Sequence, residues 1–132
     1  MTQHQSHEKL KPVRWVGSSQ DDVRKFPDEA RWRVGGALWE AQHGRKASYV
    51  KPLKGFGGAS VLEIVDDFEG DTFRAVYTVR FAEAIYVLHA FQKKSKRGMA
   101  TPKAEMSLIE QRLKRAKEDY EQWSASVTPK FP

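Results

Sequence analysis

Three strand-like segments joined by short connections constrain the fold of this 132-residue chain more than any other feature. The segments are about Ser60–Asp66, Thr72–Arg80 and Ile85–Gln92, and each is rich in β-branched, aromatic and other apolar residues. Glu69–Asp71 supplies the first turn and residues 81–84 supply the second. Connections this short require antiparallel neighbours, because a parallel crossover needs a dozen or more residues. The sequence therefore predicts an antiparallel meander.

Helical patterns flank this meander on both sides. A short strand is predicted at Val13–Val16, followed by a helical hairpin whose second helix covers about Asp28–His43. One face of that helix is expected to be buried, because small apolar residues recur at helical spacing: Ala30, Val34, Ala37, Leu38 and Ala41. Thr101 and Pro102 open a C-terminal helix with an apolar stripe. The predicted fold is α+β, a small antiparallel sheet of about four strands with the hairpin on one face and a C-terminal helix.

Length and composition indicate a single domain. Residues 12–124 are predicted to form it, with residues 1–11 as a flexible leader and residues 125–132 as a flexible tail. The chain has no Cys, which excludes disulfides and thiolate metal sites, and its histidines show no ligand spacing with carboxylates. We therefore expect no metal and no cofactor. No apolar run approaches the roughly 18 residues of a membrane span, and a secretion signal is missing, so we expect a cytoplasmic protein with no membrane partner.

Positive charge is concentrated in one quarter of the chain. The net charge is +6, and the isoelectric point is about 9.6. Residues 93–117 contain nine Lys or Arg and only two acidic residues, Glu105 and Glu110, so the local net charge is +7. The densest part directly follows the third meander strand: Lys93, Lys94, Lys96 and Arg97. Such a patch at a sheet edge favours a polyanionic partner, with nucleic acid the best candidate, over a merely solvated basic helix.

Strand alternation assigns the meander side chains to two faces. If Arg74 pairs with Val65 and His89 with Val76, one face is apolar and should carry the helical hairpin. That face would hold Leu62, Ile64, Phe73, Ala75, Tyr77, Val79, Tyr86, Leu88 and Ala90. The other, open face would collect Glu63, Arg74, Thr78, Arg80, His89 and Phe91. A slip of one residue would reverse the grouping on a strand.

The second face has the side chains for RNA cleavage without a metal. In that chemistry a base removes the proton of the 2′-OH, which attacks the adjacent phosphate, and cations stabilise the added charge. His89 could serve as base or acid. Arg74 and Arg80 would clamp the phosphate, and Lys93 or Lys94 would add charge or supply a proton. The predicted catalytic residues are Arg74, His89, Lys93 and Arg80, with Phe91 as a stacking platform for a base.

Each of these roles has a structural alternative. His89 could be a hydrogen-bonded structural residue of an apolar strand. Glu63 and Arg74 could form an ion pair and nothing more. Arg80 could be an exposed strand end, and Phe91 could belong to the core.

Three segments of the sequence resemble a known family. They are KPLKGFGGASVLEI at Lys51–Ile64, FRAVYTV at Phe73–Val79 and YVLHAFQKKSKRGMATPKAEM at Tyr86–Met106. Together with the order of elements, they resemble the RelE/HigB-type toxins of type II toxin–antitoxin systems, in particular the phage-derived HigB-like branch. One departure is that Val65 stands where many relatives have an arginine.

The resemblance implies a RelE-like fold and a ribosome-dependent mRNA endonuclease that enters the vacant A site. It also implies neutralisation by a cognate helix-turn-helix antitoxin. By position, Lys54, Arg74 and the Lys93–Arg97 cluster match functional basic residues of related toxins. The RNA- or ribosome-binding residues are then Lys54, Phe91, Lys94, Lys96 and Arg97.

Two other functional classes fit the same residues. One is a non-catalytic RNA- or DNA-binding accessory protein of phage origin, and the other is a protein-interaction domain whose basic helix docks an acidic partner. Trp32 and Trp39 lie seven residues apart on one helix face. They belong either to the core or to a partner-binding ridge, and the sequence does not separate these.

Overall fold

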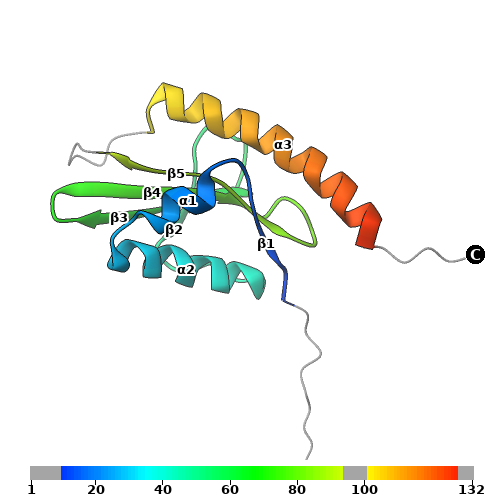
Figure 1. The fold of residues 1–132 in the computed structure, drawn as a ribbon, viewed down its shortest axis with the longest axis horizontal. Coiled ribbons are helices and arrows are strands. Elements are labelled where there is room, and N and C mark those ends of the chain that lie inside the picture. The colour runs from blue at the N-terminus through cyan, green and yellow to red at the C-terminus, as the bar shows by residue number, and fades with distance from the viewer. Residues whose placement is uncertain (1–9, 94–100, 128–132) are drawn as a thin grey trace, which may run out of the picture.

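The computed structural model describes residues 10–93 and 101–127 and confirms the α+β class (Figure 1). Its elements, in chain order, are β1 (Val13–Trp15), α1 (Ser19–Arg24), α2 (Asp28–Gln42), β2 (Val50–Pro52), β3 (Val61–Phe68), β4 (Asp71–Thr78), β5 (Ile85–Lys93) and α3 (Lys103–Val127). No helix in the described ranges has the length and apolar character that a membrane crossing requires. The last helix continues through Val127, beyond the predicted start of the tail.

The sheet has five strands in the order β1-β5-β4-β3-β2. The predicted meander is confirmed, because β3, β4 and β5 are consecutive antiparallel neighbours. β1 adds to β5 in parallel, and β2 adds to β3 in antiparallel orientation. β2 was not predicted because it has three residues and includes Pro52. An edge strand tolerates this proline, since its missing N–H need not face a neighbour.

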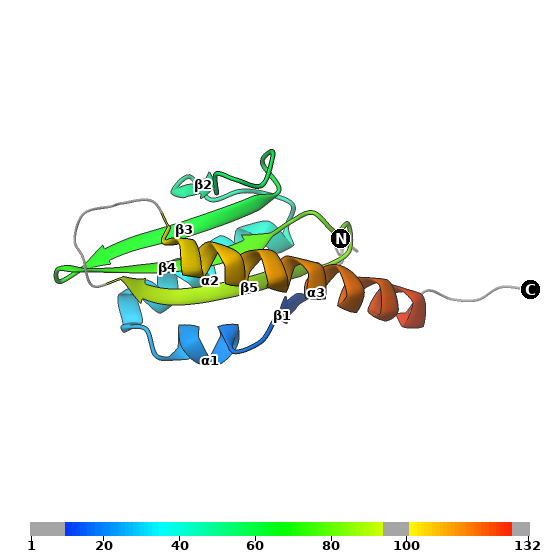
Figure 2. The same ribbon diagram turned by 90° about the horizontal axis from the view of Figure 1, so that it is seen from above.

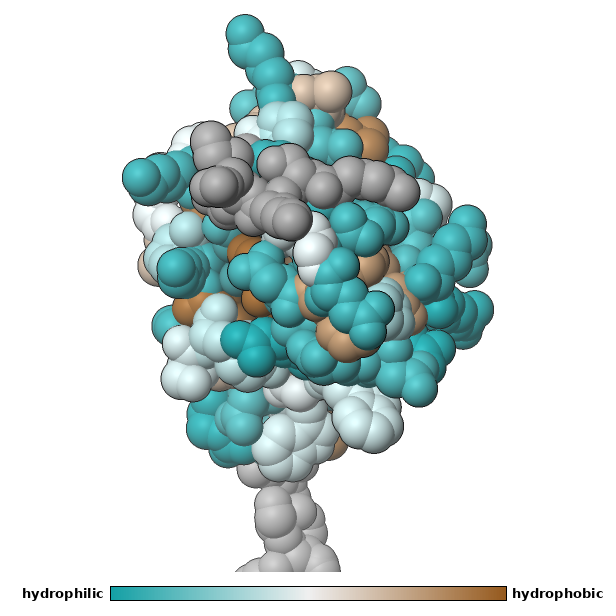
Figure 3. Space-filling view, turned by 90° about the vertical axis from the view of Figure 1, so that its left-hand side faces the viewer, coloured by the Kyte–Doolittle hydropathy of each residue, from teal (hydrophilic) through white to brown (hydrophobic). Residues whose placement is uncertain are grey.

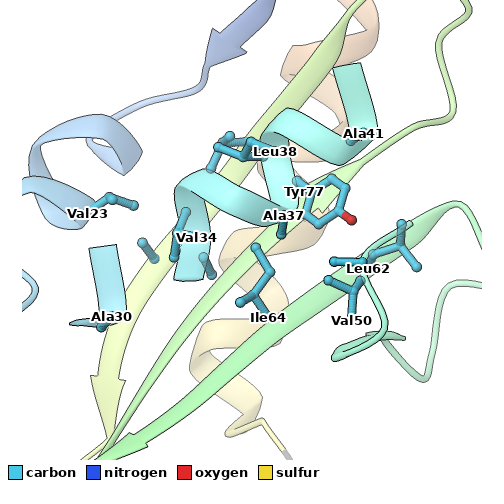
Figure 4. Close-up of a cluster of buried hydrophobic side chains, with 14 of the residues drawn as sticks. Val23, Ala30, Val34, Ala37, Leu38, Ala41, Val50, Leu62, Ile64 and Tyr77 are labelled. Atoms are coloured by element: carbon cyan, nitrogen blue, oxygen red, sulfur yellow. The ribbon is translucent and has the colours of Figure 1, made fainter. Parts of the chain in front are cut away.

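Helices cover both faces of the sheet (Figures 1 and 2). α1 and α2 form the predicted hairpin on one face, and the buried stripe of α2 packs on β3 and β4 (Figure 4). Val34 and Ala37 lie there over Ile64 and Tyr77. α3 crosses the other face, where Ile109 and Ala116 join a second buried cluster. The second face of the sheet is therefore partly covered, whereas the sequence predicted it to be open.

A β-bulge corrects part of the predicted grouping. The expected pairs Val65–Arg74 and Val76–His89 are present. The register then shifts between Val76 and Tyr77, so that Tyr77 pairs with Val87. Tyr86 and Leu88 consequently pack in the α3 cluster, and their assignment to the hairpin face was wrong. Strand alternation cannot reveal a bulge, because the inserted residue changes the phase without changing residue type.

Trp32 and Trp39 are surface residues of α2. Their exposed fractions are 77% and 51%, which excludes the core alternative. Between them Gly35 is also exposed, and a side chain added there would meet nothing within 4 Å. Trp39 packs against His43, with ring centroids 4.2 Å apart, and the guanidinium of Arg45 lies over its ring at 5.4 Å, so its contacts are with the end of α2 and the residues that follow it.

Candidate functional site

Three rows of side chains cross the α3 face of the sheet. The register places Lys51, Glu63, Val76 and His89 in one row and Val65, Arg74 and Phe91 in the next. Asp67, Thr72 and Lys93 form the third row, where Thr72 donates a hydrogen bond of 2.8 Å to Asp67. The grouping of Glu63, Arg74, His89 and Phe91 on one face thus follows the sequence prediction.

A groove of about 740 Å³ lies on this part of the molecule, between the β2 side of the sheet and the start of α3. Its charged lining comes from separate elements, with Arg33 in α2, Lys51 in β2, Lys54 in the loop after it, Glu63 and Asp67 in β3 and Arg74 in β4. Thr101 and Met106 close it from the side of α3. Figure 3 views the end of the molecule where β3 turns into β4, and hydrophilic side chains cover most of that surface.

Arg74 forms the wall of this groove as half of an ion pair. Its Nη1 lies 3.3 Å from Oε2 of Glu63. The Arg74 side chain is only 5% exposed, and that of Glu63 is 16% exposed. The ion-pair alternative is therefore present in the structure, and the pair faces a cavity that a phosphate-bearing ligand could enter.

His89 lies beneath the first turns of α3. Its Nε2 is 2.5 Å from Oε1 of Glu105, and its Nδ1 is 3.1 Å from Nη1 of Arg112. Phe91 stacks on the imidazole at a centroid distance of 5.1 Å. Burial lowers the pKa of the Arg112 guanidinium below its ordinary value. Both rings are thus held by protein contacts, and His89 is not the open group that the sequence predicted.

The structure does not bring all predicted residues together. Arg80 follows β4, and its Nε donates to Oγ of Ser60 at 3.2 Å. It lines a second hollow of about 690 Å³ with Phe56 and Lys114. Arg80 is six positions after Arg74, about 20 Å along a strand at roughly 3.3 Å per residue, and it lines a different hollow, so the two arginines do not clamp one phosphate.

Lys54 lies in the groove lining, and Lys93 ends β5 on the same sheet face as His89 and Phe91. Lys94, Lys96 and Arg97 lie outside the described residues.

Sequence reasoning missed Lys51, Glu105 and Arg112. Arg112 is basic, a residue type that usually lies on the exposed side of a helix, but it is buried. Glu105 and Arg112 are seven residues apart and next to the apolar stripe, a spacing that places both toward the sheet. That spacing was the signal in the sequence that both residues lie toward the sheet. It was missed because charged residues usually lie on the solvent side of a helix. Within the described residues, no cluster of three or more potential metal ligands is present.

The family described as Phage derived protein Gp49-like (DUF891) matches residues 21–114, which is more than two thirds of the chain. A solved structure with a similar fold is the toxin–antitoxin complex RelBE2 from Mycobacterium tuberculosis. The TM-score is 0.42 at 17% sequence identity, and the similarity covers 66% of the present chain and 95% of the matched chain in that complex. No curated protein matches the chain at a significant level.

Proposed function

Because the chain belongs to the family of phage-derived Gp49-like proteins, we propose that it is the toxin of a type II toxin–antitoxin system and cleaves mRNA on the ribosome. The family membership agrees with the resemblance to the phage-derived branch of RelE/HigB-type toxins. The proposal includes a cytoplasmic location and a helix-turn-helix antitoxin as the neutralising partner.

The observation that carries this proposal is the convergence of cationic side chains on the groove. Lys51, Lys54 and Arg74 come from three different segments and line one cavity beside the sheet. Cations at fixed positions stabilise the charge that develops on a phosphate under attack by the neighbouring 2′-OH. This reaction needs no resident metal, because the nucleophile belongs to the RNA itself.

We assign the roles by position. Arg74, held by Glu63, would contact the scissile phosphate from the groove wall, and Lys54 would bind a flanking phosphate. Lys93 would add charge at the end of β5. Arg80 would contact RNA outside the groove, and the residues that follow Lys93 in the sequence would dock on ribosomal RNA: Lys94, Lys96 and Arg97.

Mapping of mRNA 5′ ends after a short induction tests the proposal. The chain should produce new ends inside translated reading frames, and these should vanish when translation is blocked before induction. Lys54→Ala should reduce the cuts at least tenfold, whereas Lys25→Ala, an exposed cation after α1, should leave them unchanged. Cuts that persist without translating ribosomes would contradict the A-site proposal.

The burial of His89 favours one alternative, a non-catalytic RNA- or DNA-binding protein of phage origin. Both ring nitrogens of His89 are occupied by contacts with Glu105 and Arg112, so neither is available to a bound substrate. In that case the purified chain would bind RNA with strong salt dependence, and induction would yield no new mRNA ends.

A further inference from the structure

A chain of hydrogen bonds connects three side chains between α3 and β5. Arg112 contacts Nδ1 of His89 at 3.1 Å, and Nε2 of His89 contacts Glu105 at 2.5 Å. Arg112 is anchored at two further points, because Nη1 donates to the Leu88 carbonyl at 3.0 Å and Nη2 donates to Oγ of Ser18 at 3.3 Å. The guanidinium is therefore fixed by β5 and by the segment that enters α1.

The chemistry of arginine sets the direction of this chain. A guanidinium has only donors, so Nδ1 of His89 must accept the bond from Arg112. The proton of the neutral ring then lies on Nε2, which donates to the carboxylate of Glu105. A second ring proton on Nδ1 would point at an N–H of the guanidinium. Arg112 thus selects the tautomer of His89 that has its proton on Nε2. His89 donates this proton to the carboxylate of Glu105, which accepts the hydrogen bond.

Exposure separates the members of the chain. The His89 side chain is 7% exposed, whereas the Glu105 side chain is 32% exposed. Glu105 is next to Met106 in the first turn of α3, and Met106 and Thr101 both line the groove. A carboxylate has two oxygens with about four acceptor sites, so the bond from His89 leaves capacity for a ligand proton. Glu105 itself lies beside these lining residues in the sequence, and among the three side chains of the chain of hydrogen bonds it is the most exposed to solvent.

We infer that Glu105 is the catalytic base of this site and that His89 and Arg112 are positioning residues that orient its carboxylate. The inference rests on the proposed ribonuclease function. Glu105 would take the proton of the 2′-OH, the 2′-oxygen would bond to phosphorus, and the bond from phosphorus to the 5′-oxygen would break. The leaving 5′-oxygen would take a proton from water, and Glu105 would return its proton to solvent. The products would be a 2′,3′-cyclic phosphate and a 5′-hydroxyl end.

Single-turnover cleavage of mRNA on purified, programmed ribosomes tests the role of Glu105. Glu105→Gln keeps an oxygen that can accept from His89 but cannot act as a base. The cleavage rate should fall about 100-fold or more, with ribosome affinity unchanged within about twofold. Glu118→Gln, an exposed carboxylate on the same helix, should cleave like the wild type. Thermal unfolding of both variants checks that α3 remains docked.

A separate measurement tests the positioning role of His89 and Arg112. ¹⁵N NMR of the wild-type imidazole should show a proton on Nε2 and none on Nδ1. Arg112→Met, which keeps length but removes the donors, should yield a mixture of tautomers and a cleavage rate at least tenfold lower at unchanged ribosome affinity. A wild-type ring protonated on Nδ1 would overturn the chain of bonds described here.

The outcomes distinguish this inference from the function on which it rests. If the wild type cleaves and a folded Glu105→Gln variant cleaves equally fast, the inference fails and the proposed function stands. If the wild type cuts no mRNA on ribosomes, the proposed function fails and the catalytic role of Glu105 fails with it.

Discussion

A single glycine makes room for the buried guanidinium of Arg112. Gly17 has a φ of +58°, and a Cβ added there would lie 2.8 Å from Cζ of Arg112. The guanidinium cannot move aside without loss of its bonds to Leu88 and Ser18. At the scale of single residues, the order around His89 therefore depends on a backbone conformation that other residues rarely adopt.

Gly17→Ala should accordingly lower the free energy of unfolding by about 2 kcal/mol, through backbone strain and displacement of Arg112. Urea denaturation of the purified protein measures this value. Gly35→Ala is the matched control, because Gly35 lies within α2 with open space around it. It should raise the free energy of unfolding by about 1 kcal/mol. Equal stability of Gly17→Ala and the wild type would contradict the packing described for Arg112.

The exposed tryptophan of α2 permits a second prediction about single residues. Trp32 is 77% exposed, so its replacement removes little packing. Trp32→Lys should change the free energy of unfolding by less than about 0.5 kcal/mol. Val34→Ala, at a buried position on the opposite side of α2, should cost about 1 to 3 kcal/mol in the same measurement. A large loss for Trp32→Lys would show that this ring has a packing role within the folded chain.

At the scale of elements, polar contacts fix α3 to the sheet at two places, in addition to its apolar packing. Near its start the contacts are those of Glu105 and Arg112 with β5. Farther along, Asp119 accepts from Nε of Arg14 at 2.8 Å and from the hydroxyl of Tyr86 at 2.5 Å. The second contact joins α3 to β1 and β5. It holds the helix to β1, which is far from it in the sequence, and to the start of β5.

The second contact predicts a pH dependence of stability. The hydrogen bond from Arg14, followed by that from Tyr86, lowers the pKa of Asp119 below its ordinary value of 3.8. A lowered folded-state pKa contributes stability above the unfolded pKa, and that stability is lost as the pH falls through the folded value. Asp119→Asn should therefore be less stable than the wild type at pH 7. The difference should shrink as the pH falls below about 4.

The size of this effect is limited by solvent. The Asp119 side chain is 45% exposed, so screening should keep the difference in free energy of unfolding to about 1 kcal/mol or less. Urea denaturation from pH 7 down to pH 3 measures it. A deficit that stays constant over this range would mean that the charge of Asp119 is not its cause.

Sequence patterns predicted which segments form strands and helices better than they predicted which helix covers each face of the sheet. Short turns determined the order of β3, β4 and β5, and alternation put Arg74 and His89 on one face. Alternation does not say what lies on that face. Whether α3 covers His89 depends on how Glu105 and Arg112 dock on β5, and their spacing along the helix does not determine which strand residues they meet. The bulge beside Val76 could not be predicted from the sequence either, because it depends on how two strands pair.

At the scale of the whole molecule, the helical hairpin, the sheet and α3 form three layers, and they leave different charges on different surfaces. The groove between β2 and the start of α3 has Lys51, Lys54 and Arg74 in its lining. The exposed stripe of α2, on the other side of the sheet, holds tryptophans and glycines. A net charge of +6 attracts any polyanion, so bulk charge alone cannot show that the groove is the binding surface.

The salt dependence of RNA binding separates the groove from the bulk charge. Each cation that neutralises a phosphate of single-stranded RNA releases a counterion and contributes about 0.7 to the slope of log affinity against log salt concentration. Lys51→Ala and Lys54→Ala should each reduce the steepness of that slope by about this amount. Lys25→Ala removes the same unit of net charge from the surface near α1 and should leave the slope unchanged. Fluorescence anisotropy with a labelled oligonucleotide between about 50 and 200 mM salt measures all four proteins. Equal reductions in the three variants would mean that RNA is held by diffuse charge, and the groove would lose its assignment as the site where a phosphate is bound.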